Sequence, residues 1–260
     1  MENPGVPIAV TAAVLFTIAA LWLLRYQIGL RRVTDALVAA EEALDDGETS
    51  RARELVSPLL TRYPKLAVVQ EVAADVLYAS GDPLSAASLW EQAMKKLGAA
   101  RVAPRLVAAY AALNRAGDAR RVAALVPEDR LARVTLAWSE LAAVGGDREQ
   151  GRVLTDELVR DEQIRPTASG EAMTCALVAI AAARAGELVR MRAALARADA
   201  RGAELAAHDR AFVGYLVGIA QREAGAPAVA RATWTAAMEV APESIGAALA
   251  RRERSHLPEA

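Results

Sequence analysis

Residues 65–98 read KLAVVQEVAADVLYASGDPLSAASLWEQAMKKLG, and this stretch decides the fold. Two helical patterns flank a short turn, Ser80 to Pro83, in the middle of it. After the turn, Ala86, Trp90 and Ala93 recur at the spacing of one helical face. A proline tolerates the first position of a helix, where its missing N–H would be unpaired in any case. The stretch therefore predicts a helix–turn–helix hairpin, which needs neighbours to bury its apolar face.

The turn recurs along the chain at irregular intervals. Each copy has a glycine and, five positions later, a small or apolar residue. The glycine can end a helix because it adopts the left-handed conformation at little energetic cost. We expect that second residue to let the two helices of a hairpin approach closely. The pairs are Gly47 with Ala52, Gly81 with Ala86, Gly117 with Val122, Gly146 with Gly151, Gly186 with Met191, and Gly225 with Ala230.

The hairpin resembles the tetratricopeptide repeat (TPR), a helix–turn–helix unit of about 34 residues. That family has a small residue before the turn, Gly-Asp in it, and Ala, an aromatic, Ala and Pro at set distances after it. The copies that match best contain Gly81, Asp82, Ala86, Trp90 and Ala93, and Gly218, Gly225, Ala230, Trp234, Ala237 and Pro242. Gly98 replaces the proline in the former, and the third, fourth and fifth copies match only in the turn and the periodicity. The resemblance implies an α-solenoid of about five to six units over residues 29–260; the alternative is an unrelated alanine-rich helical bundle.

The composition also predicts an all-α protein. Hydrophobic residues make up 54% of the chain but aromatic residues only 4%, and much of the apolar content is alanine, which favours helix over strand. The formal net charge of −1 argues against a general nucleic-acid-binding surface. Cys175 is the single cysteine, so the chain has no internal disulfide and no cysteine-based zinc site.

An uncharged apolar run near the N-terminus predicts a transmembrane helix. A helix from Val6 to Leu24 would be roughly 28 Å long at about 1.5 Å per residue, close to the thickness of a bilayer core. A cleaved signal peptide fits less well, because Glu2 and no basic residue precedes the run and no small-residue cleavage site ends it. We therefore divide the chain into an anchor, residues 1–28, and a TPR-like domain, residues 29–260.

Basic residues set the expected orientation of this anchor. Arg25, Arg31 and Arg32 follow the apolar run and none precedes it, so the positive-inside rule places the C-terminal domain in the cytoplasm. The alanine- and arginine-rich composition is typical of a bacterial protein. The sequence thus predicts a single-pass protein of a bacterial inner membrane.

The sequence carries no pattern that indicates catalysis. His208 and His256 are the only histidines and do not have metal-ligand spacing, and no glycine-rich phosphate loop, nucleophile elbow or HExxH motif is present. Cys175 lies in an alanine-rich helical stretch, where a buried cysteine behaves as a small core residue. We therefore expect no enzyme activity, no cofactor and no metal.

The resemblance implies where partners would bind. In TPR-like solenoids the first helix of each unit lines the concave face, and the family register places eight residues of this chain in that groove: Glu71, Asp75, Tyr78, Met173, Ile180, Phe212, Tyr215 and Ile219. Burial between units is the competing interpretation for each of them. The sequence predicts a membrane-anchored, non-catalytic protein–protein interaction scaffold; the alternative is a structural subunit of a larger membrane complex, held mainly through its transmembrane helix.

Overall fold

The computed structural model describes residues 31–143, 145–164 and 167–257, and these residues contain helices and no strand. The first described helix covers residues 31–45. The others are α2 (Thr49–Arg62), α3 (Ala67–Ala79), α4 (Pro83–Leu97), α5 (Ala99–Ala112), α6 (Ala116–Ala123), α7 (Arg130–Ala142), α8 (Arg148–Ile164), α9 (Ala168–Arg184), α10 (Leu188–Arg201), α11 (Ala207–Glu223), α12 (Pro227–Val240) and α13 (Ile245–Ser255), with a short 3-10 turn, Gly202–Glu204, before α11. The prediction of an all-α fold is confirmed for this part of the chain.

The described helices pair into six consecutive hairpins, followed by α13. The helix over 31–45 pairs with α2 as unit 1, α3 with α4 as unit 2, and so on to α11 with α12 as unit 6. We call the first helix of each unit its inner helix. Neighbouring inner helices pack side by side, as α5 with α7 and α9 with α11, which is the arrangement of a helical solenoid.

The hairpin turns follow one backbone motif. At Gly81 the residue is left-handed, its N–H bonds to the Tyr78 carbonyl at 2.9 Å, and the next N–H bonds to the Leu77 carbonyl at 2.9 Å. This pair of bonds is the Schellman motif, which satisfies the last carbonyls of a helix. The same pattern occurs at Gly47, Gly186 and Gly225.

Two predicted turn positions are wrong. The third turn lies at Asn114, with φ of 58°, and not at Gly117, which is inside α6. Asparagine tolerates the left-handed region better than most residues, so it takes the place of glycine here. In the fourth turn Gly145, with φ of 81°, is the left-handed residue, and the predicted Gly146 follows it.

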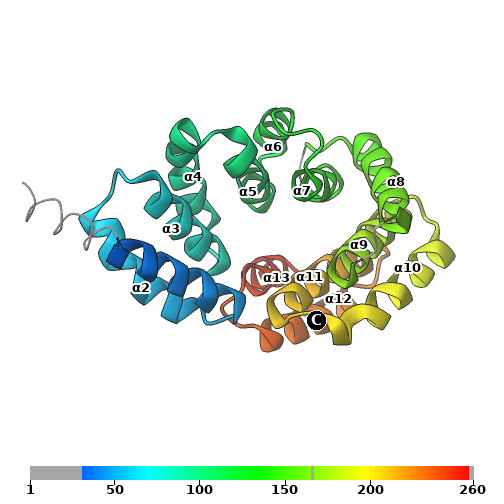
Figure 1. Ribbon diagram of the computed structural model, residues 1–260. Helices are drawn as coiled ribbons and strands as arrows, with labels where there is room; N and C mark the ends of the chain where they lie inside the picture. Colours follow the sequence, from blue (N-terminus) through cyan, green and yellow to red (C-terminus); the bar gives the residue numbers. More distant parts are fainter. Residues whose placement is uncertain (1–30, 144, 165–166, 258–260) are drawn as a thin grey trace, which may run out of the picture.

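The solenoid curls until its first and last units meet (Figure 1). The Glu243 carboxylate, between α12 and α13, accepts hydrogen bonds from the Thr49 and Ser50 hydroxyls of α2, both at 2.7 Å. Farther along, Arg252 of α13 donates to the Ala112 carbonyl of α5 at 2.6 Å. We call the contact of Glu243 with α2, which joins the two ends of the solenoid, the seam. It closes the helices into a ring.

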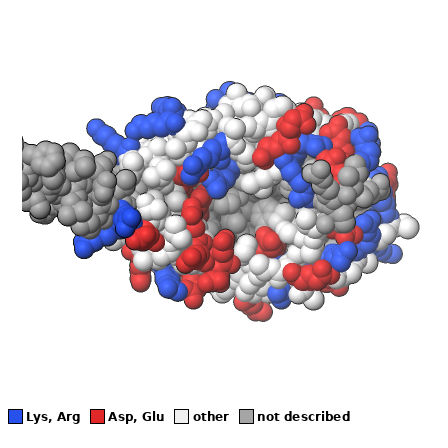
Figure 2. All heavy atoms as spheres, in the orientation of Figure 1, with Lys and Arg blue, Asp and Glu red and all other residues white. Residues whose placement is uncertain are grey.

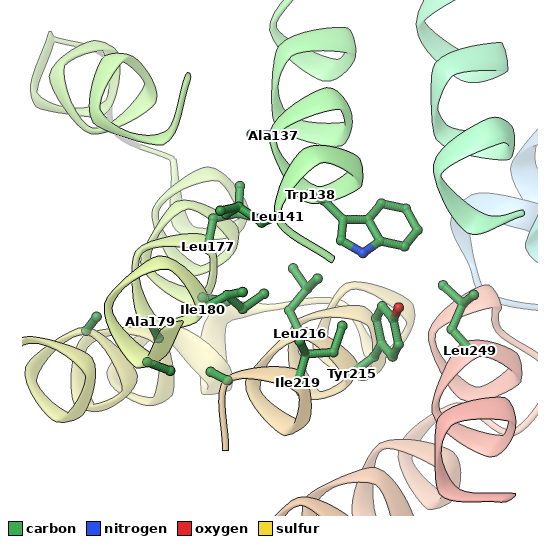
Figure 3. Packing of buried hydrophobic residues seen from close by; sticks show 14 of the residues in the cluster. Ala137, Trp138, Leu141, Leu177, Ala179, Ile180, Tyr215, Leu216, Ile219 and Leu249 are labelled. Carbon is green, nitrogen blue, oxygen red and sulfur yellow. The ribbon is translucent and has the colours of Figure 1, made fainter. Parts of the chain in front are cut away.

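The largest hydrophobic core lies in the C-terminal half of this ring. It joins buried side chains of α7, α9, α11, α12 and α13, among them Trp138, Tyr215 and Leu249 (Figure 3). Trp138 meets the Tyr215 ring edge-on, with 5.8 Å between ring centroids. The inner faces of three units are therefore packed against one another and against α13.

The predicted anchor, residues 1–28 with the apolar run from Val6 to Leu24, lies outside the described residues, as does its boundary with the TPR-like domain. Within 31–257, apart from the gaps at 144 and 165–166, no helix is both long and apolar enough to cross a bilayer.

Candidate functional site: the central cavity

The ring surrounds a cavity of about 730 Å³ that opens to solvent, which we call the central cavity. Inner helices of five units line it, together with the end of the helix over 31–45 and the segment joining α12 to α13. Its aromatic and larger apolar lining residues are Leu44, Tyr78, Trp90, Leu131, Val134, Met173, Phe212, Val240 and Ile245. A volume of this size, an apolar wall and a few polar groups are the usual features of a binding pocket.

Four of the eight residues predicted to face the groove line the central cavity. Asp75 and Tyr78 come from α3, Met173 from α9 and Phe212 from α11, and all four are partly exposed. Tyr78 packs against Trp90, with 5.5 Å between ring centroids. The fold therefore brings these four side chains to one cavity, although they are far apart in the sequence.

The other four predicted groove residues are buried. Ile180, Tyr215 and Ile219 are at most 2% exposed and belong to the C-terminal core. Their prediction as exposed groove residues is wrong, because α9 and α13 both pack against α11, and Trp138 of α7 meets the Tyr215 ring. Glu71 is 2% exposed and is held by two guanidinium groups, as described next.

An ion-pair cluster forms one corner of the cavity. The Glu71 carboxylate accepts from Arg101 at 2.6 Å and from Arg105 at 2.7 Å. Arg105 also reaches Asp75, at the longer distance of 3.3 Å. Glu71 thus forms ion pairs with two arginines, whereas Asp75 shares one arginine with it.

Burial gives Asp75 an unusual pKa. Removal from water raises the pKa of its carboxyl to about 7; Arg105 opposes this shift and the Glu71 charge adds to it. The Asp75 side chain nevertheless remains 18% exposed, so a molecule in the cavity can reach it. Its charge consequently changes near neutral pH.

Further acidic groups line the cavity. Asp45 ends the helix over 31–45 and Asp46 follows it, Asp209 lies in the first turn of α11, and Glu243 lies at the seam. The lining cations are Arg105 and, when it is protonated, His208, whose Nε2 is 3.6 Å from Asp209. Figure 2 shows acidic atoms gathered beside a hollow in the middle of the molecule. The cavity therefore favours positive charge.

Sequence reasoning missed the C-terminal side of this site. Glu243, Ser244 and Ile245 line the cavity because the seam brings the end of the chain back to unit 1. No local pattern signals such a contact between distant segments. Trp90 was predicted only as a packing residue, and its indole ring also forms part of the cavity wall.

Other polar residues on the inner helices are engaged elsewhere. Glu140, which is 0% exposed, receives two hydrogen bonds from Arg120 of α6, at 2.8 and 2.9 Å. Arg133 pairs with Glu157 and Asp161 of α8. Among the described residues no group of three or more His, Cys, Asp and Glu side chains is placed to hold a metal ion.

Comparison with known proteins identifies the fold and no family. No family model matches the chain, and no curated protein matches it. Among solved structures, the crystal structure of PilW, described as a widely conserved type IV pilus biogenesis factor, superposes with a TM-score of 0.52. The chain is similar in fold to PilW. The match covers 81% of this chain and 96% of the PilW chain at 17% sequence identity.

At that identity the likeness to PilW shows the fold alone. It agrees with the TPR-like repeat predicted from the turns and supports that assignment over an unrelated helical bundle. The resemblance to PilW covers most of the described helices, whereas the predicted anchor lies outside the described residues.

Proposed function

We propose that this chain is a non-catalytic protein–protein interaction scaffold, held at a bacterial inner membrane by residues 1–28. The observation that carries the proposal is the central cavity, because inner helices of five units meet around one partly apolar volume. Interface anchors are commonly aromatic side chains in pockets of this kind, and the partly exposed Tyr78 and Phe212 supply them here.

The membrane part of the proposal rests on the sequence. The apolar run from Val6 to Leu24 would anchor the chain, and the arginines after it would keep the ring in the cytoplasm. A cysteine introduced near residue 258 should then resist membrane-impermeant thiol reagents in intact cells. Labelling there without permeabilisation would instead place the ring outside the cytoplasm.

PilW is described as a type IV pilus biogenesis factor. A chain with a similar fold is suited to a similar role in assembly. We propose that this chain recruits or organises proteins during assembly of a bacterial envelope structure, a type IV pilus being one example. The likeness of fold supports that choice only as an analogy of architecture.

Stoichiometry tests the scaffold proposal. After crosslinking in cells and solubilisation in mild detergent, a scaffold should carry client proteins in substoichiometric amounts, and Phe212→Ala in the cavity should reduce their yield. The change Val189→Ala, at an exposed position of α10, should leave the yield unchanged. A fixed stoichiometric complex that forms equally with both variants would contradict the proposal and favour a structural subunit held through its transmembrane helix.

A further inference from the structure

We propose that the central cavity binds a short, basic peptide segment, with a lysine or arginine side chain beside Asp75 and apolar side chains against Tyr78 and Phe212. The proposal rests on the proposed scaffold function and gives the chemistry of the partner. It is argued from the size of the cavity, the incomplete pairing at Asp75 and the charges around the cavity.

The cavity limits the size of its occupant. It offers about 730 Å³ and opens to solvent, so part of an occupant can lie outside it. A short segment of a partner chain fits there, whereas a folded domain does not.

The carboxylate of Asp75 is incompletely paired. It shares Arg105 with Glu71 and lies at the longer distance, 3.3 Å against 2.7 Å. The indole N–H of Trp90 faces this carboxylate from within the cavity wall and, at 1% exposure of the residue, is too deeply buried for a ligand to reach. A lysine or arginine side chain in the cavity would complete the pairing of Asp75.

The surrounding charges favour more than one cation. Asp45, Asp46, Asp209 and Glu243 lie on the unit 1 turn, on α11 and at the seam, so a single small amine would contact only a fraction of them. A segment with several basic residues can approach carboxylates on different sides of the cavity. The same charges repel an acidic segment, which gives the site its selectivity.

Titration of Asp75 gives the proposal a second, independent readout. The charged and polar groups that influence this carboxyl are Arg105 of α5, Glu71 of α3, Trp90 of α4 and Glu41 of the helix over 31–45. His208 and Asp209 of α11 face the same cavity. A bound cation stabilises the ionised carboxylate, so peptide affinity should rise as the pH rises through the carboxyl's pKa of about 7.

The test uses the full-length chain in mild detergent and three synthetic five-residue peptides, measured by titration calorimetry. One alternates three lysines with two phenylalanines; the second has glutamates in place of the lysines; the third has serines in place of the phenylalanines. We expect the first to bind, the third to bind at least about tenfold more weakly, and the second not to bind. Increasing salt should weaken the first interaction.

Substitutions locate the site. Asp75→Asn should weaken binding of the lysine–phenylalanine peptide by about tenfold and flatten its dependence on pH. Asp209→Asn, at a more exposed carboxylate, should weaken binding less and keep that dependence, and it remains informative if Asp75→Asn does not fold.

The control is Asp156→Asn, which removes a carboxylate of α8 outside the cavity and should change nothing. His208→Gln shows whether the histidine contributes to the pH profile; a profile abolished by that change and kept in Asp75→Asn would contradict the proposal.

Equal binding of the glutamate and lysine peptides, or no binding of either, would overturn the proposal. Displacement of the peptide by N-acetyl-lysine amide at equal concentration would also overturn it, in favour of a site for small cations. The scaffold function is tested separately by crosslinking. If client proteins are still captured and their yield still falls in Phe212→Ala, the scaffold function holds even though the peptide proposal fails. If no client protein is captured at all, the scaffold function is wrong as well.

Discussion

Replacing Gly218 with valine should destabilise the ring by about 3 kcal/mol or more. A Cβ atom at this position of α11 would lie 2.1 Å from Nε1 of Trp234 and 2.5 Å from its Cδ1. Trp234 is 0% exposed, and its Nε1–H donates to the Tyr215 carbonyl at 3.0 Å. The indole ring therefore has no free space to enter, and moving it breaks a buried hydrogen bond.

Chemical denaturation of the full-length chain, followed by circular dichroism, measures this effect. Gly117→Ala is the matched control, because Gly117 also lies in a helix but has no atom within 4 Å of the added Cβ position. That change should be neutral or stabilise the chain by up to about 1 kcal/mol. A Gly218→Val protein that unfolds at the wild-type midpoint would show that α11 and α12 are not packed as described.

Tyr215→Ala should cost about 3–5 kcal/mol of folding stability, the range for removing a large aromatic side chain from a core. Tyr215 is 2% exposed and contacts Trp138 and Phe212, with 5.8 and 6.0 Å between ring centroids. Phe212 is partly exposed to the cavity, so Phe212→Ala should cost less stability and more binding. Comparing the two variants therefore distinguishes a residue that stabilises the core, Tyr215, from one that contacts a partner, Phe212.

Differential scanning calorimetry of both variants, with client capture in parallel, checks this division. Tyr215→Phe keeps the ring and should remain close to wild type in stability. If Tyr215→Ala melts at the wild-type temperature and loses clients, the residue faces a groove, as the family register predicted, and the closed ring is wrong.

Local chemistry accounts for what the sequence predicts well. The turn glycines at 47, 81, 186 and 225 end helices because glycine adopts the left-handed conformation without steric strain. Small residues such as Ala52, Ala86 and Ala230 are buried where the two helices of a hairpin approach each other. The turn at Asn114 was misassigned because a nearby glycine carries the stronger local signal. Sequence spacing alone does not show which of two candidates takes the left-handed conformation.

The burial of Tyr215 and Ile219 has a different origin. The register of a repeat predicts which side chains face inward, but the amount of curl decides whether that inner face stays open or is covered. Here the curl adds up over several units and brings Glu243 back to α2 and α13 against α5. Contacts of this range depend on many small angles between helices, and no motif in the chain encodes them.

The central claim is that partners bind in the cavity inside the ring, and site-specific photo-crosslinking in cells tests it most directly. A photoreactive residue replaces Met173, which lines the cavity, or Val189, which is 84% exposed on α10, in otherwise identical chains. We predict a crosslinked partner from position 173 that Asp75→Asn diminishes, and none from position 189. A partner that crosslinks only from position 189 would contradict binding in the central cavity.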